Sequence, residues 1–310
     1  MKSLLCCWAP VLALLLSGTP AWTQSAYRYK DANGNWVYTD QAPAATAHDD
    51  SINLARQSES LHVDIERGYQ DTTTTLTAIN DCICIASFTA RIVHSQDPTI
   101  KDGAVFRKVL QPHTHELLIS IENAGRADKD LQYQWRITLG SPNAEHKPPR
   151  PYRAPFAVGS TFVVSQAYPA QFTHVTPDSQ YAVDIALPDG SQVYAAREGT
   201  VINVRHDAFR GGLSPVLLDQ ANVVEILHED GTIAMYAHLH WDSIRVHIGQ
   251  HVGRGEYIAN SGSTGFSSGP HLHFCVVRNA GFEAVSVPVE FAGPSDVPVT
   301  PETQKPLTAY

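Results

Sequence analysis

Short runs in which apolar and polar residues alternate dominate the chain beyond residue 60, and they predict strands. Between residues 61 and 140 such runs include TLTAIND, ASFTARIV, HELLISIEN and LQYQWRITLG, separated by polar turns. An alternation with a period of two places the apolar side chains on one face of a half-buried strand. We therefore predict a β-rich accessory domain over 61–140, of the β-sandwich type.

The second half of the chain shows the same pattern at higher density. The runs TFVVSQAY, YAVDIALP, NVVEILHE, TIAMYAHLH and HLHFCVVRN are punctuated by glycines, and almost no stretch has a helical period. Five prolines between residues 141 and 156 predict a semi-rigid linker at 141–155. We expect a mainly β fold, with a second antiparallel domain at 156–292 and a C-terminal tail at 293–310.

The first 26 residues, MKSLLCCWAPVLALLLSGTPAWTQSA, combine one lysine, an apolar run and a stretch of small residues. This is the plan of a secretory signal peptide, so we assign residues 1–26 to a leader and expect export. An uncleaved anchor and lipid attachment at Cys6 or Cys7 are weaker alternatives, because Pro10 interrupts the short run that contains both cysteines. No later stretch predicts a membrane span, so we expect no stable membrane insertion.

The stretch YRYKDANGNWVYTDQAP, residues 27–43, carries an Asn-Gly pair between two aromatic-rich alternating runs. That arrangement is a strong hairpin signal and predicts a small hairpin module at 27–60. Its Tyr-Arg-aromatic, Asp-x-Asn-Gly and Tyr-x-Asp pattern resembles a small module of unknown function on bacterial secreted proteins. The resemblance implies a protein of the bacterial periplasm or cell envelope.

Charge and cysteine content narrow the possible partners. The formal net charge is −9 and no long run of Lys and Arg occurs, so nucleic acid is not an expected partner. Cys82 and Cys84 are compatible with a disulfide in an oxidising compartment, but strand positions two apart lie at the edge of feasible geometry, so this pairing stays open. Cys275 is expected to be a buried, small apolar residue.

Two histidine pairs with the same spacing are candidates for chemistry. In SSGPHLHF, His271 and His273 would share one face of a strand, and in PHTHELLISI, His113 and His115 would do the same. With 15 histidines in the chain, spacing alone does not choose between the pairs. The second pair has no Gly-rich approach loop, no nearby Asp and no matching motif elsewhere, so we expect surface or pocket-lining histidines there.

Three segments of the second half, FTHVTPDSQYAVDIALPDG, MYAHLH and GPHLHF, resemble the lysostaphin-type zinc metallopeptidases, which cut peptide cross-links in bacterial cell walls. The resemblance runs in order from about Tyr152 to Glu290 and includes VYAAREGTV and VHIGQHVGRGEYIANSGSTG. One departure is that nine residues separate the first histidine from the aspartate, more than in many members. The resemblance implies zinc ligands and catalytic histidines at these positions: His174, Asp184 and His273 as ligands, and His238 and His271 as catalytic residues.

The chemistry of these residue types agrees with such roles. Two imidazoles and one carboxylate leave a tetrahedral position open, which is the plan of catalytic zinc. Asp184 lies inside an apolar strand, where an unpaired carboxylate is costly. No HExxH motif occurs, so a histidine is the natural general base. We expect Tyr236 to be a core aromatic and His240 a groove or surface residue, and we expect four further histidines to face solvent: His206, His228, His247 and His251.

The resulting hypothesis is a secreted zinc endopeptidase with one zinc ion per chain and peptidoglycan as its partner. It would hydrolyse peptide bonds in stem peptides or cross-links through a zinc-activated water. A non-catalytic peptidoglycan-binding or amidase-activating protein of the same fold is the alternative, although such relatives typically lack some of the five residues. A zinc hydrolase acting on other peptides also stays open, because loops around the groove set specificity.

Overall fold

We describe the fold from a computed structural model. It describes residues 61–310 except 98–99, 123–129 and 171, and, before residue 61, the backbone of three short strands. The predicted leader at 1–26 lies outside the described residues. The chain divides into two compact units, 1–57 and 58–310. No helix in the described part of the chain is long and apolar enough to cross a membrane.

The N-terminal unit contains a small antiparallel sheet in the order β2-β1-β3. Strands β1 and β2 pair with Tyr27 opposite Thr39 and Lys30 opposite Trp36, which confirms the predicted hairpin. The bounds of its three strands are β1 (Tyr27–Lys30), β2 (Trp36–Thr39) and β3 (Ile52–Asn53).

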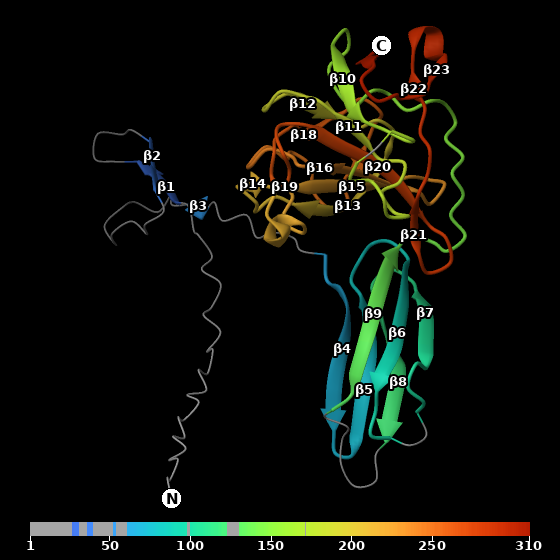
Figure 1. Cartoon of the computed structure of the whole chain (residues 1–310). Helices are drawn as coiled ribbons and strands as arrows, with labels where there is room; N and C mark the ends of the chain where they lie inside the picture. Colours follow the sequence, from blue (N-terminus) through green and yellow to red (C-terminus); the bar gives the residue numbers. More distant parts are fainter. Residues whose placement is uncertain are drawn as a thin grey trace, which may run out of the picture. The chain divides into compact units, whose positions relative to one another are not determined.

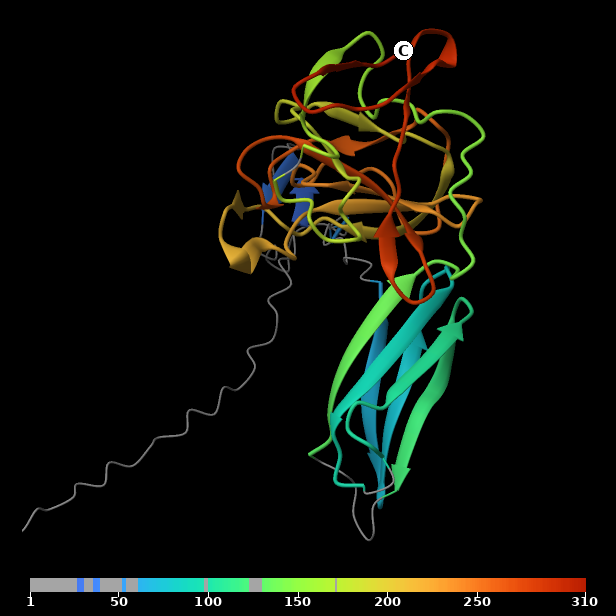
Figure 2. The same ribbon diagram turned by 45° about the vertical axis from the view of Figure 1, so that its right-hand side comes forward.

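The accessory domain is a sandwich of two three-stranded antiparallel sheets, β4-β5-β8 and β7-β6-β9 (Figures 1 and 2). Leu76 and Ala78 of one sheet and Phe88 and Ile92 of the other are fully buried in one shared core. The predicted β-sandwich is therefore confirmed. Its strands are β4 (Val63–Gln70), β5 (Thr73–Asn80), β6 (Ala86–His94), β7 (Val105–Leu110), β8 (Thr114–Glu122) and β9 (Gln132–Leu139).

The second half forms a nine-stranded antiparallel sheet in the order β17-β13-β15-β16-β20-β11-β10-β24, with β21 paired to β20 (Figure 1). Helical structure in the described residues is limited to two short 3₁₀ turns, so the mainly β prediction is confirmed. The strands of the sheet are β10 (Thr161–Gln166), β11 (Val183–Ile185), β13 (Gly199–Arg205), β15 (Val223–Leu227), β16 (Ile233–Ala237), β17 (His251–Val252), β20 (Leu272–Asn279), β21 (Ala284–Ser286) and β24 (Pro306–Thr308).

Smaller elements lie in the segments of the chain that connect the strands of this sheet. Strands β12 and β18 pair antiparallel, β14 and β19 pair parallel, and β22 pairs with β23. Their bounds, with those of the two 3₁₀ turns, are β12 (Gln192–Tyr194), β14 (Gly211–Gly212), η1 (Pro215–Leu217), β18 (Tyr257–Asn260), β19 (Gly265–Phe266), β22 (Phe291–Ala292), η2 (Pro294–Asp296) and β23 (Pro298–Val299).

Strand β20 lies between β16 and β11 and has two different faces. Leu272, Phe274 and Val276 are fully buried in the core, as a period of two requires. His273 therefore points to the opposite face of the sheet. The same alternation that builds the core thus places this imidazole on the face where the candidate ligands gather.

Strand β20 also ends on the accessory domain. Asn279, its last residue, is 1% exposed, and its Nδ2 donates to the Ser87 hydroxyl at 2.8 Å and to the Gly140 carbonyl at 2.9 Å. Cys82 and Cys84 form a disulfide that packs in an apolar cluster with Ile233. The hydrogen bonds of Asn279 and this apolar cluster are both buried, and they fix the sandwich to strand β20, which also carries His273.

The proline-rich stretch contributes side chains to the core of the second half. Tyr152 is 1% exposed, donates its backbone N–H to the Glu290 carbonyl at 2.9 Å, and packs edge-on against Phe274. Phe156 is equally buried and packs against Phe162. The prolines limit the conformations of this stretch, while its aromatic residues hold it against the sheet.

His228, at the end of β15, does not face solvent, so that prediction is wrong. It is 2% exposed, its Nδ1 donates to the Glu198 carbonyl at 2.8 Å, and its ring contacts Tyr152 edge-on. The position of His228 next to a turn suggests an exposed side chain. In the fold, however, the proline-rich stretch covers it. Burial, the main cause, lowers the pKa of His228 to about 4.

We expect His228 to make the protein less stable as the pH falls from about 6.5 to about 4. The unfolded chain takes up a proton at the ordinary pKa while the folded chain stays neutral, so protonation favours unfolding by up to about 3 kcal/mol. His228→Asn keeps a donor for the Glu198 carbonyl but does not titrate. Its urea midpoint should fall less than that of the parent over this pH range, and an equal fall would contradict the assignment.

Candidate metal centre

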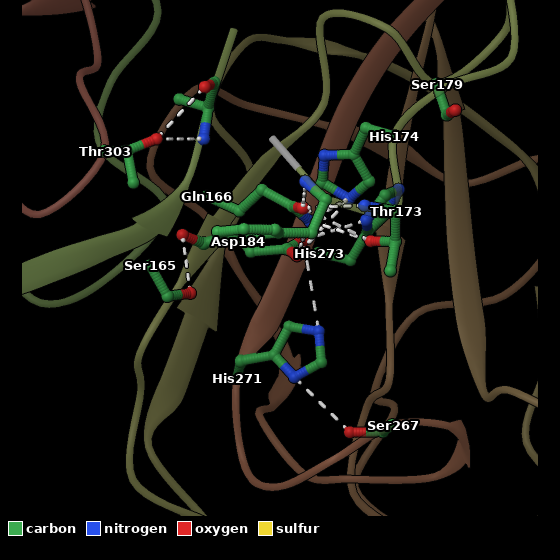
Figure 3. Close-up of polar contacts among 12 residues, drawn as sticks. Ser165, Gln166, Thr173, His174, Ser179, Asp184, Ser267, His271, His273 and Thr303 are labelled. Atoms are coloured by element: carbon green, nitrogen blue, oxygen red, sulfur yellow. Dashed lines mark hydrogen bonds and ion pairs between the residues drawn. The ribbon is translucent and has the colours of Figure 1, made fainter. Parts of the chain in front are cut away.

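Three side chains converge on one point above the sheet: His174, Asp184 and His273 (Figure 3). Asp184 on β11 lies directly opposite His273 on β20, and Asp184 Oδ1 is 2.9 Å from His273 Nδ1. His174, on the loop between β10 and β11, places Nε2 at 3.3 Å from Asp184 Oδ2. One ligand atom from each residue lies within 4.8 Å of the other two, so a single ion can contact all three.

The carboxylate in this group is held in its ionised form. Burial alone raises the pKa of Asp184, but the hydrogen bonds with His174 and His273 outweigh burial and hold the pKa well below its ordinary value. His174 and Asp184 are only 5% and 8% exposed. A buried carboxylate between two imidazoles is the environment of a metal ligand, because a metal supplies the compensating charge.

The donor set fits zinc in a catalytic arrangement. Two imidazole nitrogens and one carboxylate oxygen are ligands that zinc prefers. In the described part of the chain this group contains three such residues, and structural zinc sites usually have four. The arrangement therefore matches a site that keeps one position open for reaction.

Two further imidazoles face the same region from neighbouring elements. His238 follows β16 and His271 precedes β20, and their ring centroids lie 4.6 Å apart. His238 Nδ1 donates to the Thr264 carbonyl at 2.7 Å, and His271 Nδ1 donates to the Gly269 carbonyl at 2.9 Å. Since a carbonyl only accepts, both Nδ1 atoms carry a proton, and in the neutral form of each imidazole the lone pair lies on Nε2.

The two imidazoles lie outside the ligand group. His271 Nε2 is 3.9 Å from Asp184 Oδ1 and lies outside the set of converging ligand atoms. Burial and, next, the neighbouring His271 lower the pKa of His238 to about 4, so His238 is neutral at neutral pH. The structure thus brings all five predicted site residues together and separates them into three converging donors and two neighbours.

A cavity of about 320 Å³ adjoins this pair of imidazoles. Thr264 lines the cavity and accepts the hydrogen bond of His238, and Pro270 lines it next to His271. The wall also contains exposed aromatic and polar side chains suited to a peptide. Its other residues are Asp189, Phe209, Gly211, His240, Trp241 and Ser263.

The second histidine pair is placed differently. His113 and His115 are exposed on the accessory domain, as expected. His115 Nε2 lies 2.7 Å from Asp81 Oδ1, and His62 contacts the other oxygen of the same carboxylate at 2.9 Å. The sequence offered no signal for Asp81 as a partner, because it lies on a turn 34 residues before His115.

Gln166 is the residue of the site that sequence reasoning missed. It ends β10, is 6% exposed, and contacts Asp184, His174 and Thr173 (Figure 3). A glutamine at the end of a strand belongs to no ligand motif. Its pairing with Asp184 across β10 and β11 appears only once the register of the two strands is known.

Two family models match segments of this chain. The model of peptidase family M23 matches residues 178–285, and that of a domain of unknown function, DUF4124, matches residues 12–61. Peptidoglycan DD-endopeptidase ShyA of Vibrio cholerae is 32% identical over 149 residues, 48% of this chain and 31% of that protein. Peptidoglycan DD-endopeptidase ShyB of the same organism is 36% identical over 110 residues, 35% of this chain and 23% of that protein.

Among solved structures, the catalytic domain of the antimicrobial peptidase lysostaphin from Staphylococcus simulans matches with 26% identity. The match covers 41% of this chain and 77% of that domain, with a TM-score of 0.27. The chain spans about a third or less of the length of the two curated relatives. The matched family segment contains Asp184, His238, His271 and His273. Residues 178–285 therefore match peptidase family M23, in agreement with the resemblance seen in the sequence, and residues 12–61 match a small domain of unknown function.

Proposed function

We propose that this protein is a secreted zinc-dependent endopeptidase that hydrolyses peptide bonds in bacterial peptidoglycan. The observation that carries the proposal is the meeting of three ligand atoms beside two imidazoles whose Nε2 lone pairs are free of the carbonyl bonds. ShyA and ShyB, the two relatives named above, are peptidoglycan DD-endopeptidases and support this substrate class. An exported enzyme of the periplasm or cell envelope would meet that substrate.

His174, Asp184 and His273 would hold the zinc ion. Zinc in such a site supplies a nucleophile of lowered pKa, near ~7, and polarises the carbonyl of the scissile bond. His271 would act as the general base through Nε2, because its Nδ1 is already committed to Gly269. His238 is held by Thr264 through Nδ1, and it would stabilise the tetrahedral intermediate or protonate the leaving amine after its Nε2 has taken up a proton released by the attacking water.

The cavity beside the two imidazoles would receive the peptide on one side of the scissile bond. Phe209 and Trp241 are 68% and 55% exposed there, and large exposed aromatic side chains next to a reactive centre suit substrate contact. Asp189 and His240 add polar groups to the same wall, with Asp189 Oδ2 at 3.9 Å from His240 Nε2. Specificity for one peptide over another would then depend on these loops.

We expect one tightly bound zinc ion per chain and cleavage of purified muropeptides that stops when a chelator removes it. Three converging N,N,O donors suit zinc better than a soft or redox metal. The measurement is elemental analysis after reconstitution at neutral pH, with fragment masses recorded with and without chelator. Less than about a tenth of an equivalent of zinc would contradict the site. Zinc binding without cleavage of any muropeptide would favour the non-catalytic alternative.

A further inference from the structure

Gln166 connects the loop that carries His174 to the metal-ligand carboxylate (Figure 3). Its Nε2 donates to Asp184 Oδ2 at 2.8 Å and to Thr173 Oγ1 at 2.9 Å. Its Oε1 accepts the backbone N–H of Thr173 at 2.9 Å and also that of Phe172. One buried amide therefore holds two neighbouring backbone groups of the loop and one oxygen of Asp184.

The orientation of this amide follows from its partners. Backbone N–H groups only donate, so the atom that faces Phe172 and Thr173 is the amide oxygen. The amino group then faces Asp184, where only an acceptor is present. Gln166 is consequently a hydrogen-bond donor to a ligand and not itself an oxygen ligand of the metal.

The length of the loop explains why such a tie is needed. Nine residues separate His174 from Asp184, so the ligand histidine is not placed by the strand that carries the aspartate. An untethered loop of this length would lose conformational entropy whenever His174 moved into the site. The bonds from Gln166 remove that freedom before any metal arrives.

We propose that Gln166 is a positioning residue that preorganises the metal centre by fixing Asp184 and the segment 172–174. The proposal rests on the zinc site proposed above and adds to it a side chain outside the ligand set. The amino group lies 3.1 Å from His174 Nε2, but Asp184 and Thr173 can accept its two protons, so neither of those bonds depends on that nitrogen. Partners of this kind orient ligands and raise metal affinity.

A second anchor of the same loop provides a matched control. The Thr303 hydroxyl (Figure 3) accepts the backbone N–H of Ala167 at 2.9 Å, and it lies 2.7 Å from the Ala170 carbonyl and 3.0 Å from the Ala167 carbonyl, to which it can donate. Thr303 thus holds the beginning of the loop through backbone groups of Ala167 and Ala170. Loss of its hydroxyl tests the stability of the loop without removing a bond to a ligand.

The experiment compares the full chain with Gln166→Met and Thr303→Val. Methionine retains the length of glutamine without the amide. We expect the zinc dissociation constant of Gln166→Met, measured by competition with a chromophoric chelator, to rise by about 10- to 100-fold. The visible absorption bands of its cobalt-substituted form should also change. Thr303→Val should lower the melting temperature of the metal-free protein while it keeps the parent's zinc affinity and cobalt spectrum.

The outcomes separate this inference from the proposed function. If the parent protein binds no zinc, the proposed function fails. If the parent binds zinc and Gln166→Met binds it equally well with the same cobalt spectrum, Gln166 is not a positioning residue. If Gln166→Met does not fold, Thr173→Val takes its place, because it removes the hydroxyl partner of Gln166 and should weaken zinc binding by about 10-fold. Unchanged affinity in that variant would overturn the inference.

Discussion

Replacing His273 with alanine is expected to remove the zinc, whereas replacing His271 with alanine is expected to keep it and abolish most turnover. His273 offers one of the three converging ligand atoms, and its Nδ1 lies 2.9 Å from Asp184 Oδ1. His271 Nε2 lies beside the group, 3.9 Å from Asp184 Oδ1. The two histidines of one HxH motif therefore have separable roles, one in metal binding and one in proton transfer.

The expected magnitudes follow from these roles. His273→Ala should retain less than about a tenth of an equivalent of zinc after removal of free metal. His271→Ala should retain about one equivalent while its kcat on muropeptides falls by about 10²- to 10⁴-fold, the usual contribution of a general base. Elemental analysis and product masses measure both quantities in the same preparations.

His115→Ala is a matched control for these two variants. It removes the second histidine of the other HxH motif, which is exposed and paired with Asp81. Zinc content and turnover of this variant should equal those of the parent. If His271→Ala lost the zinc and His273→Ala kept it, the two roles would be reversed and the proposed ligand set would be wrong.

The contrast between the two HxH motifs shows what a sequence pattern can predict. Both motifs place their histidines near the start of a strand, and β-sheet periodicity predicts that much. Their different surroundings depend on which strands lie next to them. His273 lies between Asp184 on β11 and Ala237 on β16, whereas His115 pairs across from Ile79 in the accessory domain.

Residues that act through long-range pairing could not be predicted from the sequence. Gln166 meets Asp184 only through the register of β10 and β11. The local sequence of His228 indicates a turn and predicts exposure, while Tyr152, 76 positions earlier, covers it in the fold. The Cys82–Cys84 pairing was left open by the local geometry and is a disulfide in the structure.

The mainly β fold could be predicted because the alternation of apolar and polar residues is visible within each short segment of the sequence. In β5, the positions from Thr73 to Ala78 are alternately intermediate and buried, and in β20 the residues Leu272, Phe274 and Val276 face the core. The attachment of the accessory domain to β20 could not be predicted in the same way. It depends on Asn279, whose partners Ser87 and Gly140 lie far away in the sequence.

The backbone of His238 is strained, so a variant at this position can distinguish its role in catalysis from its effect on stability. Its φ is 61°, in the left-handed region that residues with a Cβ rarely adopt. The Nδ1 bond to Thr264 and the packing against His271 hold it there. Strained residues of this kind persist where the geometry they provide is used.

We expect His238→Asn to keep the zinc and the stability of the parent while kcat falls by about 10²- to 10⁴-fold. Asparagine tolerates positive φ, and its Nδ2 can donate to the Thr264 carbonyl in place of His238 Nδ1. Only the group at the Nε2 position is lost. The free energy of unfolding, measured in urea on the metal-free protein, should change by less than about 1 kcal/mol.

A companion variant, His238→Gln, distinguishes the two roles proposed for this imidazole. The longer amide reaches toward the Nε2 position and can donate a hydrogen bond to the tetrahedral intermediate, but it cannot give up a proton to the leaving amine. If His238→Gln recovers most of the activity lost in His238→Asn, stabilisation of the intermediate is the main role. If both variants are equally slow, proton donation is the main role. Turnover within about threefold of the parent in His238→Asn would remove His238 from the catalytic residues altogether.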